Sequence, residues 1–215
     1  MKILEPKLSP NLQNTVDFFA TMLCAQRDEE DIAHINFSGC EVQGIRAEKL
    51  DFTDCVFDGC RFTDCAMPKS SFTDVVFRKC DLSNLDLSDC SFQRVVFDGC
   101  KLMGATFTDC GLNNTHFIHC SARYAKLFQA MLKGVAFDNC DLSGCVMQEM
   151  TIRYAVFTQC RLCGAELFRT ALKGLDFSTC DIEGIVVGGE ELKGLTVNAR
   201  QACDLSRLLG LLIKD

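Results

Sequence analysis

Apolar residues recur at every fifth position of this chain, from Phe37 to Val197, and no insertion or deletion breaks the count. An α-helix needs apolar residues near every 3.6 positions and a β-strand needs every second one, so neither straight element explains a period of five. The backbone must therefore turn once per repeat. A short repeat sustained over most of a chain is typical of stacked units that bury one continuous core. The pattern predicts a solenoid.

Reading every twentieth residue gives two unbroken columns, one of phenylalanine and one of cysteine. The first contains Phe37, Phe57, Phe77, Phe97, Phe117, Phe137, Phe157 and Phe177, and the second contains Cys40, Cys60, Cys80, Cys100, Cys120, Cys140, Cys160 and Cys180. A period of twenty on a period of five means four sides per turn. We therefore predict about eight square coils, stacked at the ~4.8 Å spacing of neighbouring strands, with both columns pointing inward.

Three segments are expected along the chain: an N-terminal cap over residues 1–33, the β-helix over 34–198, and a C-terminal helix and tail over 199–215. A helix in the cap is predicted to lie over the open first coil with one apolar face, formed by Val16, Phe19, Ala20 and Leu23. The C-terminal pattern is also helical, from about Ala199 to Leu212. Its apolar face is wider than capping one coil requires, which predicts a homodimer through Ala202, Leu205, Leu208, Leu209 and Leu212.

The sixteen cysteines suggest two alternatives, disulfides and metal ligation. Adjacent rungs of the Cys column place Cα atoms ~4.8 Å apart, but parallel Cβ vectors keep the Cβ atoms farther apart than disulfides usually allow. Stacked thiols acting as small core hydrophobes are therefore favoured. Cys160 and Cys163 have the spacing of zinc ligands, but the repeat sends them in opposite directions. No metal or cofactor is expected, and the free thiols indicate the reducing cytoplasm.

Catalysis and membrane insertion have little support in the sequence. The histidines, His34, His116 and His119, lie outside any constellation with a nucleophile and an acid, and outward side chains on a rod splay apart. Glycines fall at the last position of a repeat, where a corner tolerates them, and form no phosphate-binding loop. No run approaches 18 apolar residues. The chain is not expected to be an enzyme or to cross a membrane.

The net charge of −7 lies entirely within residues 1–116. A duplex-binding protein would carry the opposite sign, so no direct nucleic-acid partner is expected. A rigid acidic rod about as wide as a duplex can instead occupy a protein surface built for DNA, and the candidate face contains Asp54, Asp58, Asp74, Asp98 and Asp138. A solvated face that only maintains solubility is the alternative, because Arg61, Arg78, Lys79 and Arg94 interrupt the acidic residues.

Several repeats are close to the Ala-(Asp/Asn)-Leu-x-x unit of the pentapeptide-repeat family, among them residues 80–84 (CDLSN) and 140–144 (CDLSG). This resemblance implies a right-handed quadrilateral β-helix. The closing segments, residues 191–197 (ELKGLTV) and 199–213, resemble those of quinolone-resistance proteins of the Qnr and MfpA type. The opening residues 1–3 and 10–12 and residues 120–125 (CSARYA) are more specifically similar to chromosomal Qnr proteins of Gram-positive bacteria.

The resemblance implies a non-enzymatic, DNA-mimic-like protein that binds the type II topoisomerases DNA gyrase and topoisomerase IV and protects them from quinolones. It also implies pairing through the C-terminal region. The repeat has no inserted loop between Phe37 and Val197, as in the MfpA-like and Gram-positive members. The alternative is a pentapeptide-repeat scaffold or interaction module with no topoisomerase partner, because many chains share this fold and a fold does not fix function.

Overall fold

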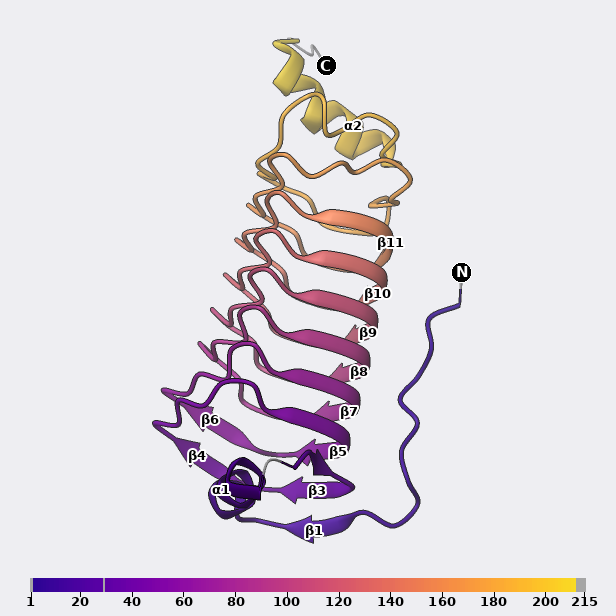
Figure 1. The fold of residues 1–215 in the computed structure, drawn as a ribbon. Helices are drawn as coiled ribbons and strands as arrows, with labels where there is room; N and C mark the ends of the chain where they lie inside the picture. Colours follow the sequence, from indigo (N-terminus) through magenta and orange to yellow (C-terminus); the bar gives the residue numbers. More distant parts are fainter. Residues whose placement is uncertain (1, 29, 212–215) are drawn as a thin grey trace.

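The computed structural model is a parallel β-solenoid of about seven turns with a helix at each end (Figure 1). It describes residues 2–28 and 30–211. The predicted pentapeptide-repeat β-helix is confirmed. The regular stack is one turn shorter than the sequence count. Residues 189–194 form consecutive turns in place of the repeat, although the Glu191 and Gly194 carbonyls still accept hydrogen bonds from the Leu172 and Gly174 N–H groups of the coil below.

All strand pairs of the main sheet are parallel, and their order is β1-β3-β5-β7-β8-β9-β10-β11, with β2 pairing with β5. Most paired residues lie twenty apart, as for Phe57 with Phe77 and Phe77 with Phe97, so one regular turn contains twenty residues. The strands are β1 (Gln13–Thr15), β2 (Ile32–Ala33), β3 (Ile35–Ser38), β5 (Asp51–Asp58), β7 (Ser71–Arg78), β8 (Ser91–Asp98), β9 (Gly111–Ile118), β10 (Met131–Asp138) and β11 (Thr151–Thr158). A second sheet contains β4 (Glu41–Gln43) and β6 (Arg61–Thr63).

The backbone bends at the last residue of most repeats, where φ is positive. In β5, for example, φ is 54° at Asp54, and the bend at Gly59 has a φ of 65°. Glycine reaches this left-handed region without a steric penalty, and Asp and Asn enter it more readily than most other residues. The long strands thus cover two sides of the coil each and bend between them (Figure 1). This bend is the structural origin of the five-residue period.

Phenylalanine rings fill the interior in columns. From Phe37 to Phe157, successive rings of the centre column are nearly parallel, with centroids 4.7 to 4.9 Å apart. A second column, of Phe52, Phe72 and Phe92, stacks at 5.0 Å. Because identical rings lie in register on neighbouring strands, they are separated by the strand spacing and form a continuous aromatic stack.

The cysteine column lies beside the rings, and every cysteine of the chain is a free thiol. Each thiol from Cys60 to Cys180 donates a hydrogen bond to the backbone carbonyl of the column phenylalanine 23 residues earlier. The Sγ–O distances range from 3.3 to 3.6 Å. Cysteine is thus both a small core residue and a weak donor to the turn below it.

Helix α1 (Phe18–Asp28) covers the first turn. Phe18 and Met22 are its buried residues, and the Phe18 ring lies 5.4 Å from the rings of Phe37 and Phe62. The Asp17 side chain accepts a hydrogen bond from the Ala20 N–H at 2.9 Å and so fixes where the helix begins. The first helical side chain therefore enters the open end of the aromatic stack.

The apolar face predicted for this helix is wrong. Val16 is 75 % exposed, Phe19 is 56 % exposed and Leu23 is 46 % exposed, and Ala20 is exposed as well. The helical period alone favoured that face, but pairing of β1 with β3 sets the point at which the chain enters the cap. From that point Phe18 reaches the ring stack, and Phe19 points away from it.

The C-terminal helix is shorter than predicted. Helix α2 (Ala199–Ser206) passes into one 3-10 turn, η1 (Arg207–Leu209), and Gly210 ends it with a φ of 71°. Leu212 and the side chain of Leu209 lie outside the described residues. Neither helix described by the structure is long and apolar enough to span a lipid bilayer.

We expect Phe97→Ala or Phe117→Ala to lower the free energy of unfolding by about 3–5 kcal/mol, because each leaves a cavity in the ring stack. Phe168→Ala is the control, since Phe168 is 43 % exposed, and it is expected to change the free energy by less than ~1 kcal/mol. Chemical denaturation measures both values. Equal effects for Phe97 and Phe168 would contradict the role of the stack.

We also expect a thiol reagent to label the cysteines of the native protein in a fixed order. Cys24 and Cys203 are exposed and should react first, half-buried Cys163 next, and the buried thiols last. Burial raises the pKa of Cys55 to about 11 and that of Cys90 to about 12, so the reactive thiolate of these two cysteines is scarce at neutral pH. Mass spectrometric mapping of the labelled cysteines at increasing reaction times measures this order. Early labelling of Cys100 or Cys120 would contradict a closed interior.

Candidate interaction surfaces

The outward side chains of the rod lie in ladders, with one member of each ladder per turn. Within residues 2–28 and 30–211, no three His, Cys, Asp or Glu side chains gather as metal ligands would. His34 contacts Asp54, and His116 contacts Glu5. Cys160 is buried and Cys163 is half-buried, although their spacing resembles that of zinc ligands. The arrangement is suited to presenting side chains to a partner surface.

Three of the predicted acidic residues lie on one side of the rod. Asp58, Asp98 and Asp138 end the strands β5, β8 and β10, and all three are half-exposed. Arg78 stands between Asp58 and Asp98 in the strand register, and its Nη1 lies 3.5 Å from Asp58 Oδ2. The twenty-residue period thus places these carboxylates in one line, two turns apart, but Arg78 interrupts the line between Asp58 and Asp98.

The other two predicted residues do not form part of an exposed acidic face, and that prediction is corrected. Asp54 is only 5 % exposed and Asp74 only 8 % exposed. Both lie at the bend between two sides of the coil, and the N-terminal segment crosses them there. Because this segment has no repeat, the sequence pattern gave no sign that it covers the rod.

Residues 2–9, which we call the N-terminal strap, run along this bend from the N-terminus, which lies beside the later turns, back towards β1 at the first coil (Figure 1). The Ser9 N–H donates to Asp54 Oδ1 at 2.8 Å, and the Lys7 N–H donates to Asp74 Oδ1 at 2.8 Å. Further along, the Leu4 N–H donates to Asn114 Oδ1 at 3.0 Å. The strap therefore spans four coils with backbone donors.

Both covered carboxylates are also held by the rod itself. His34 Nδ1 lies 2.6 Å from Asp54 Oδ2, and Arg94 donates two hydrogen bonds to Asp74, at 2.6 and 2.7 Å. Burial by itself disfavours the charged forms. The hydrogen bonds outweigh this effect, so the pKa of Asp54 and that of Asp74 both lie below the usual value.

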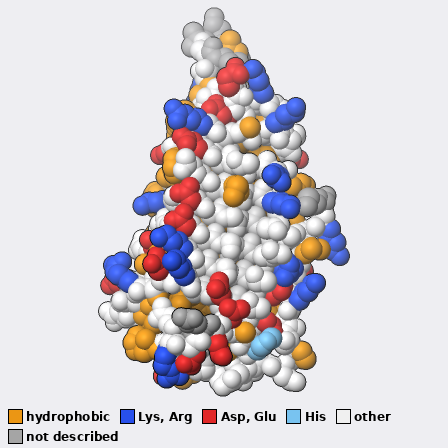
Figure 2. All heavy atoms as spheres, in the orientation of Figure 1, with side chains coloured by type: hydrophobic (Ala, Val, Ile, Leu, Met, Phe, Trp, Pro, Cys, Tyr) orange, Lys and Arg blue, Asp and Glu red, His pale blue; other side chains and the backbone are white. Residues whose placement is uncertain are grey.

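Sequence reasoning missed a second acidic edge. Asp89 and Asp109 are exposed at bends one turn apart, and Glu149 follows two turns later, where Arg169 Nη1 lies 2.8 Å from its Oε1. Figure 2 shows acidic side chains gathered along one edge of the viewed face, beside a largely uncharged centre. Reading the last position of every fourth repeat would have revealed this series.

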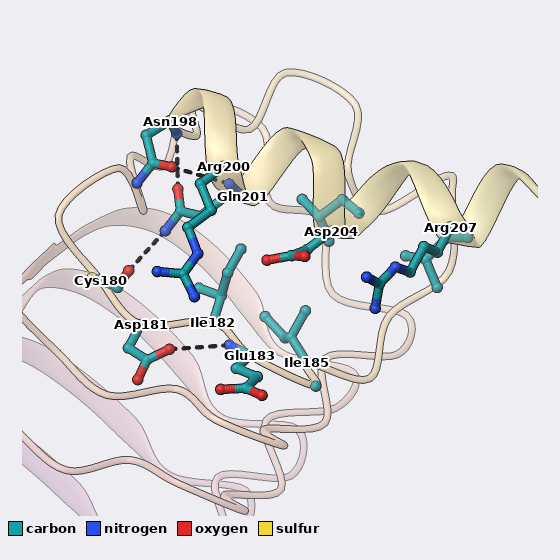
Figure 3. Close-up of a pocket in the computed structure, with 13 residues that line it drawn as sticks. Cys180, Asp181, Ile182, Glu183, Ile185, Asn198, Arg200, Gln201, Asp204 and Arg207 are labelled. Carbon is teal, nitrogen blue, oxygen red and sulfur yellow. Dashed lines mark hydrogen bonds between the residues drawn. The ribbon is translucent and has the colours of Figure 1, made fainter. Parts of the chain in front are cut away.

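At the C-terminal end, Gln201 joins helix α2 to the last coil (Figure 3). Its Nε2 donates to the carbonyls of Phe177 at 2.9 Å and Cys180 at 2.7 Å. In the turn below, the equivalent carbonyls are those of Phe157 and Cys160. They accept hydrogen bonds from the Cys180 thiol and the Asp181 N–H. Gln201 thus replaces the donors of an absent next turn. The signal for it was the capping box formed with Asn198, which the sequence analysis overlooked.

The predicted dimer residues lie on and after this helix. Ala202 is exposed, Leu205 is half-buried against the core, and Leu208 is 48 % exposed. A hollow of about 350 Å³ beside Ala202 and Leu205 is lined by the half-buried Leu192, Leu195 and Val197. On the other side of α2, a hollow of about 650 Å³ is lined by both acidic and basic groups (Figure 3). The end of the core is therefore only partly covered.

Comparison with known families and structures gives two matching family models. The model for pentapeptide repeats (8 copies) matches residues 35–74, and that for the pentapeptide repeat region matches residues 70–145, so together they span just over half of the chain. No curated protein sequence matches the chain.

Among solved structures, the chain is similar to full-length QnrB1, a plasmid-mediated fluoroquinolone resistance protein. The identity is 16 % and the TM-score 0.36, over 82 % of this chain and 100 % of that one. It is also similar to HetL of the cyanobacterium Nostoc sp. strain PCC 7120, a pentapeptide repeat protein involved in heterocyst differentiation regulation. There the identity is 17 % and the TM-score 0.26, over 81 % of this chain and 92 % of that one. At these identities the likeness concerns the fold alone.

The lowered pKa values predict how acid acts on the strap. Above about pH 3.8 the ionised Asp54 and Asp74 stabilise the native state, and this contribution is lost as the pH falls through their lower native pKa values. We expect Asp54→Asn/Asp74→Asn to be less stable than the wild type by about 1–3 kcal/mol at pH 7. Thermal melts should show the two proteins converging in acid. A gap that does not change with pH would contradict this account.

Proposed function

This chain belongs to the pentapeptide-repeat protein family, and we propose that it is a non-enzymatic interaction protein that binds type II topoisomerases, DNA gyrase and topoisomerase IV, and protects them from fluoroquinolones. The observation that carries the proposal is the rigid shaft with charged side chains at fixed intervals. A rod that is already ordered loses little conformational entropy on binding a partner.

The half-exposed carboxylates of Asp58, Asp98 and Asp138 supply the acidic contact in this proposal. They recur at every second turn, and two turns of parallel strand correspond to about 10 Å along the rod. Negative groups at regular intervals on a narrow rod are suited to a basic surface that holds DNA. The stacked bridges continue through residues 46–186, a stretch in which the structure describes every residue, and no projecting loop interrupts this surface.

The identity of the partner rests on the resemblance of the closing segments to Qnr and MfpA proteins. QnrB1, whose fold this chain shares, is described as a fluoroquinolone resistance protein. Sixteen free thiols are in keeping with the reducing cytoplasm, where the topoisomerases act on DNA.

A homodimer through the C-terminal end completes the proposal. Leu208 and Leu211 are exposed there, and the half-buried Leu192 and Leu195 border the hollow beside α2. An isologous contact would cover this apolar surface and close the open end of the solenoid. The resulting two-fold axis would match that of a symmetric topoisomerase, with the acidic halves of the two rods at the outer ends.

A scaffold with no topoisomerase partner is the second candidate, and specific observations favour it. Arg78 interrupts the acidic series, and the strap covers Asp54 and Asp74, so continuous mimicry of a duplex along the whole rod has less support than the sequence suggested. On this reading the charged surface serves a different protein partner, or solubility alone.

A supercoiling assay distinguishes the two candidates. Purified gyrase is inhibited with a fluoroquinolone, and the chain is titrated into the reaction; the topoisomerase proposal expects supercoiling to recover. Topoisomerase IV is tested in parallel by decatenation. Absence of any effect on either enzyme from a matched host would leave the scaffold as the function.

Charge variants then locate the contact. We expect Asp58→Asn/Asp98→Asn/Asp138→Asn to require about tenfold more protein for the same rescue, because three partly exposed charges together are worth about 1.4 kcal/mol. The matched control, Asp64→Asn/Asp89→Asn/Asp109→Asn, makes the same change in net charge elsewhere on the rod. If the control alone loses activity, the acidic edge at Asp89 and Asp109 is the contact instead.

The dimer has its own test. Light scattering should give twice the chain mass for the wild type at tens of micromolar, and the monomer mass for Leu208→Asp, which places a charge in the apolar contact. Val16→Asp is the matched control, because Val16 is 75 % exposed at the opposite end of the rod. A monomeric wild type would contradict the dimer, and a dimeric Leu208→Asp variant would move the contact elsewhere.

A further inference from the structure

The N-terminal strap is held to the rod in an unusual way, because it buries almost none of its own side chains. No residue of the strap is buried, and Leu4 and Leu8 are 50 % and 38 % exposed. Ile3, Pro6 and Ser9, which are three residues apart, are the half-buried members. Such a period is typical of an extended, polyproline-like backbone. The strap therefore depends on hydrogen bonds rather than on packing.

Those hydrogen bonds recognise a backbone rather than a sequence. The N–H groups of Ser9, Lys7 and Leu4 are the donors, and oxygens of Asp54, Asp74 and Asn114 are the acceptors. Any extended segment with free N–H groups at the same intervals can make these bonds. Strap side chains add polar contacts: Glu5 Oε1 lies 3.1 Å from His116 Nδ1, and the Ser9 side chain hydrogen-bonds to Asp54.

The acceptors are oriented by the rod and not by the strap. Arg94 holds Asp74 through two hydrogen bonds, and His34 contacts the second oxygen of Asp54. Both aspartates also sit in the left-handed backbone conformation of the bend, with φ of 54° and 56°. A binding site whose polar groups are fixed before the ligand arrives loses little freedom when it binds.

We propose that this bend, formed by Asp54, Asp74 and Asn114, is a docking site for an extended polypeptide, and that residues 2–9 are its resident intramolecular ligand. The site accepts in their place an extended segment of a partner protein. The partner segment must offer free N–H groups at two positions separated by one residue, as Lys7 and Ser9 do. A basic residue at the first of them is favoured, because Asp74 attracts the Lys7 charge. Attachment in cis gives the strap a millimolar effective concentration, so it blocks weak competitors.

The test uses the full chain and a fluorescein-labelled peptide with the sequence of residues 2–10 (KILEPKLSP). Lys7→Pro/Ser9→Pro removes both N–H donors from the strap and should free the site. Lys7→Ala/Ser9→Ala is the matched control, because it changes the same side chains and keeps the donors. In fluorescence anisotropy, we expect the proline variant to bind the peptide at least about tenfold more tightly than the wild type or the alanine control.

Adding Asp54→Ala/Asp74→Ala to the proline variant should abolish this binding, since the acceptors are then absent. No binding to the proline variant would overturn the proposal, and so would equal binding to all three chains, which would place the peptide elsewhere.

Hydrogen exchange gives a second test that does not depend on the proline variant folding. In the wild type the Lys7 and Ser9 amides should be protected, and Asp54→Ala/Asp74→Ala should lose that protection while Val75 and Phe77 keep theirs. Equal protection in both proteins would also overturn it.

Discussion

The fixed distance between one turn and the next is the constraint on which the rest of this structure depends. Parallel strands hold successive turns at the strand spacing, and the phenylalanine rings stack at 4.7 to 4.9 Å because they follow it. A side chain inside the rod must therefore tolerate a copy of itself directly above and below. Flat rings and small thiols do so, which explains why two columns of the interior are single residue types.

The same constraint creates a problem at each end of the rod, where the next turn is absent. At the first coil, Phe18 supplies a further ring to the aromatic stack. At the last coil, the Gln201 amide donates to two carbonyls that would otherwise face a missing turn. Burying apolar surface and satisfying polar groups are separate requirements, and this chain meets each with one residue from a helix.

Outside the rod, the constraint produces ladders of side chains rather than a converging site. Cross-strand neighbours are one turn apart, so a charge in one turn is always close to the charge in the next. Asp58 and Arg78 form such a pair on the exposed surface, and Asp74 and Arg94 form a more strongly held pair beneath the strap. Function on such a surface must come from the pattern of ladders, and from whatever covers or uncovers them.

The sequence by itself determined the solenoid, the four-sided coil and the inward columns. It could do so because every turn repeats the same contacts, so that the period of the sequence is the period of the structure. The half-exposed series of Asp58, Asp98 and Asp138 followed from the same count. Only the tertiary structure decided what the non-repeating ends do. The strap covers Asp54 and Asp74, Phe18 rather than Phe19 enters the core, and α2 ends at Ser206. Each depends on a contact between segments far apart in the chain, which no local period records.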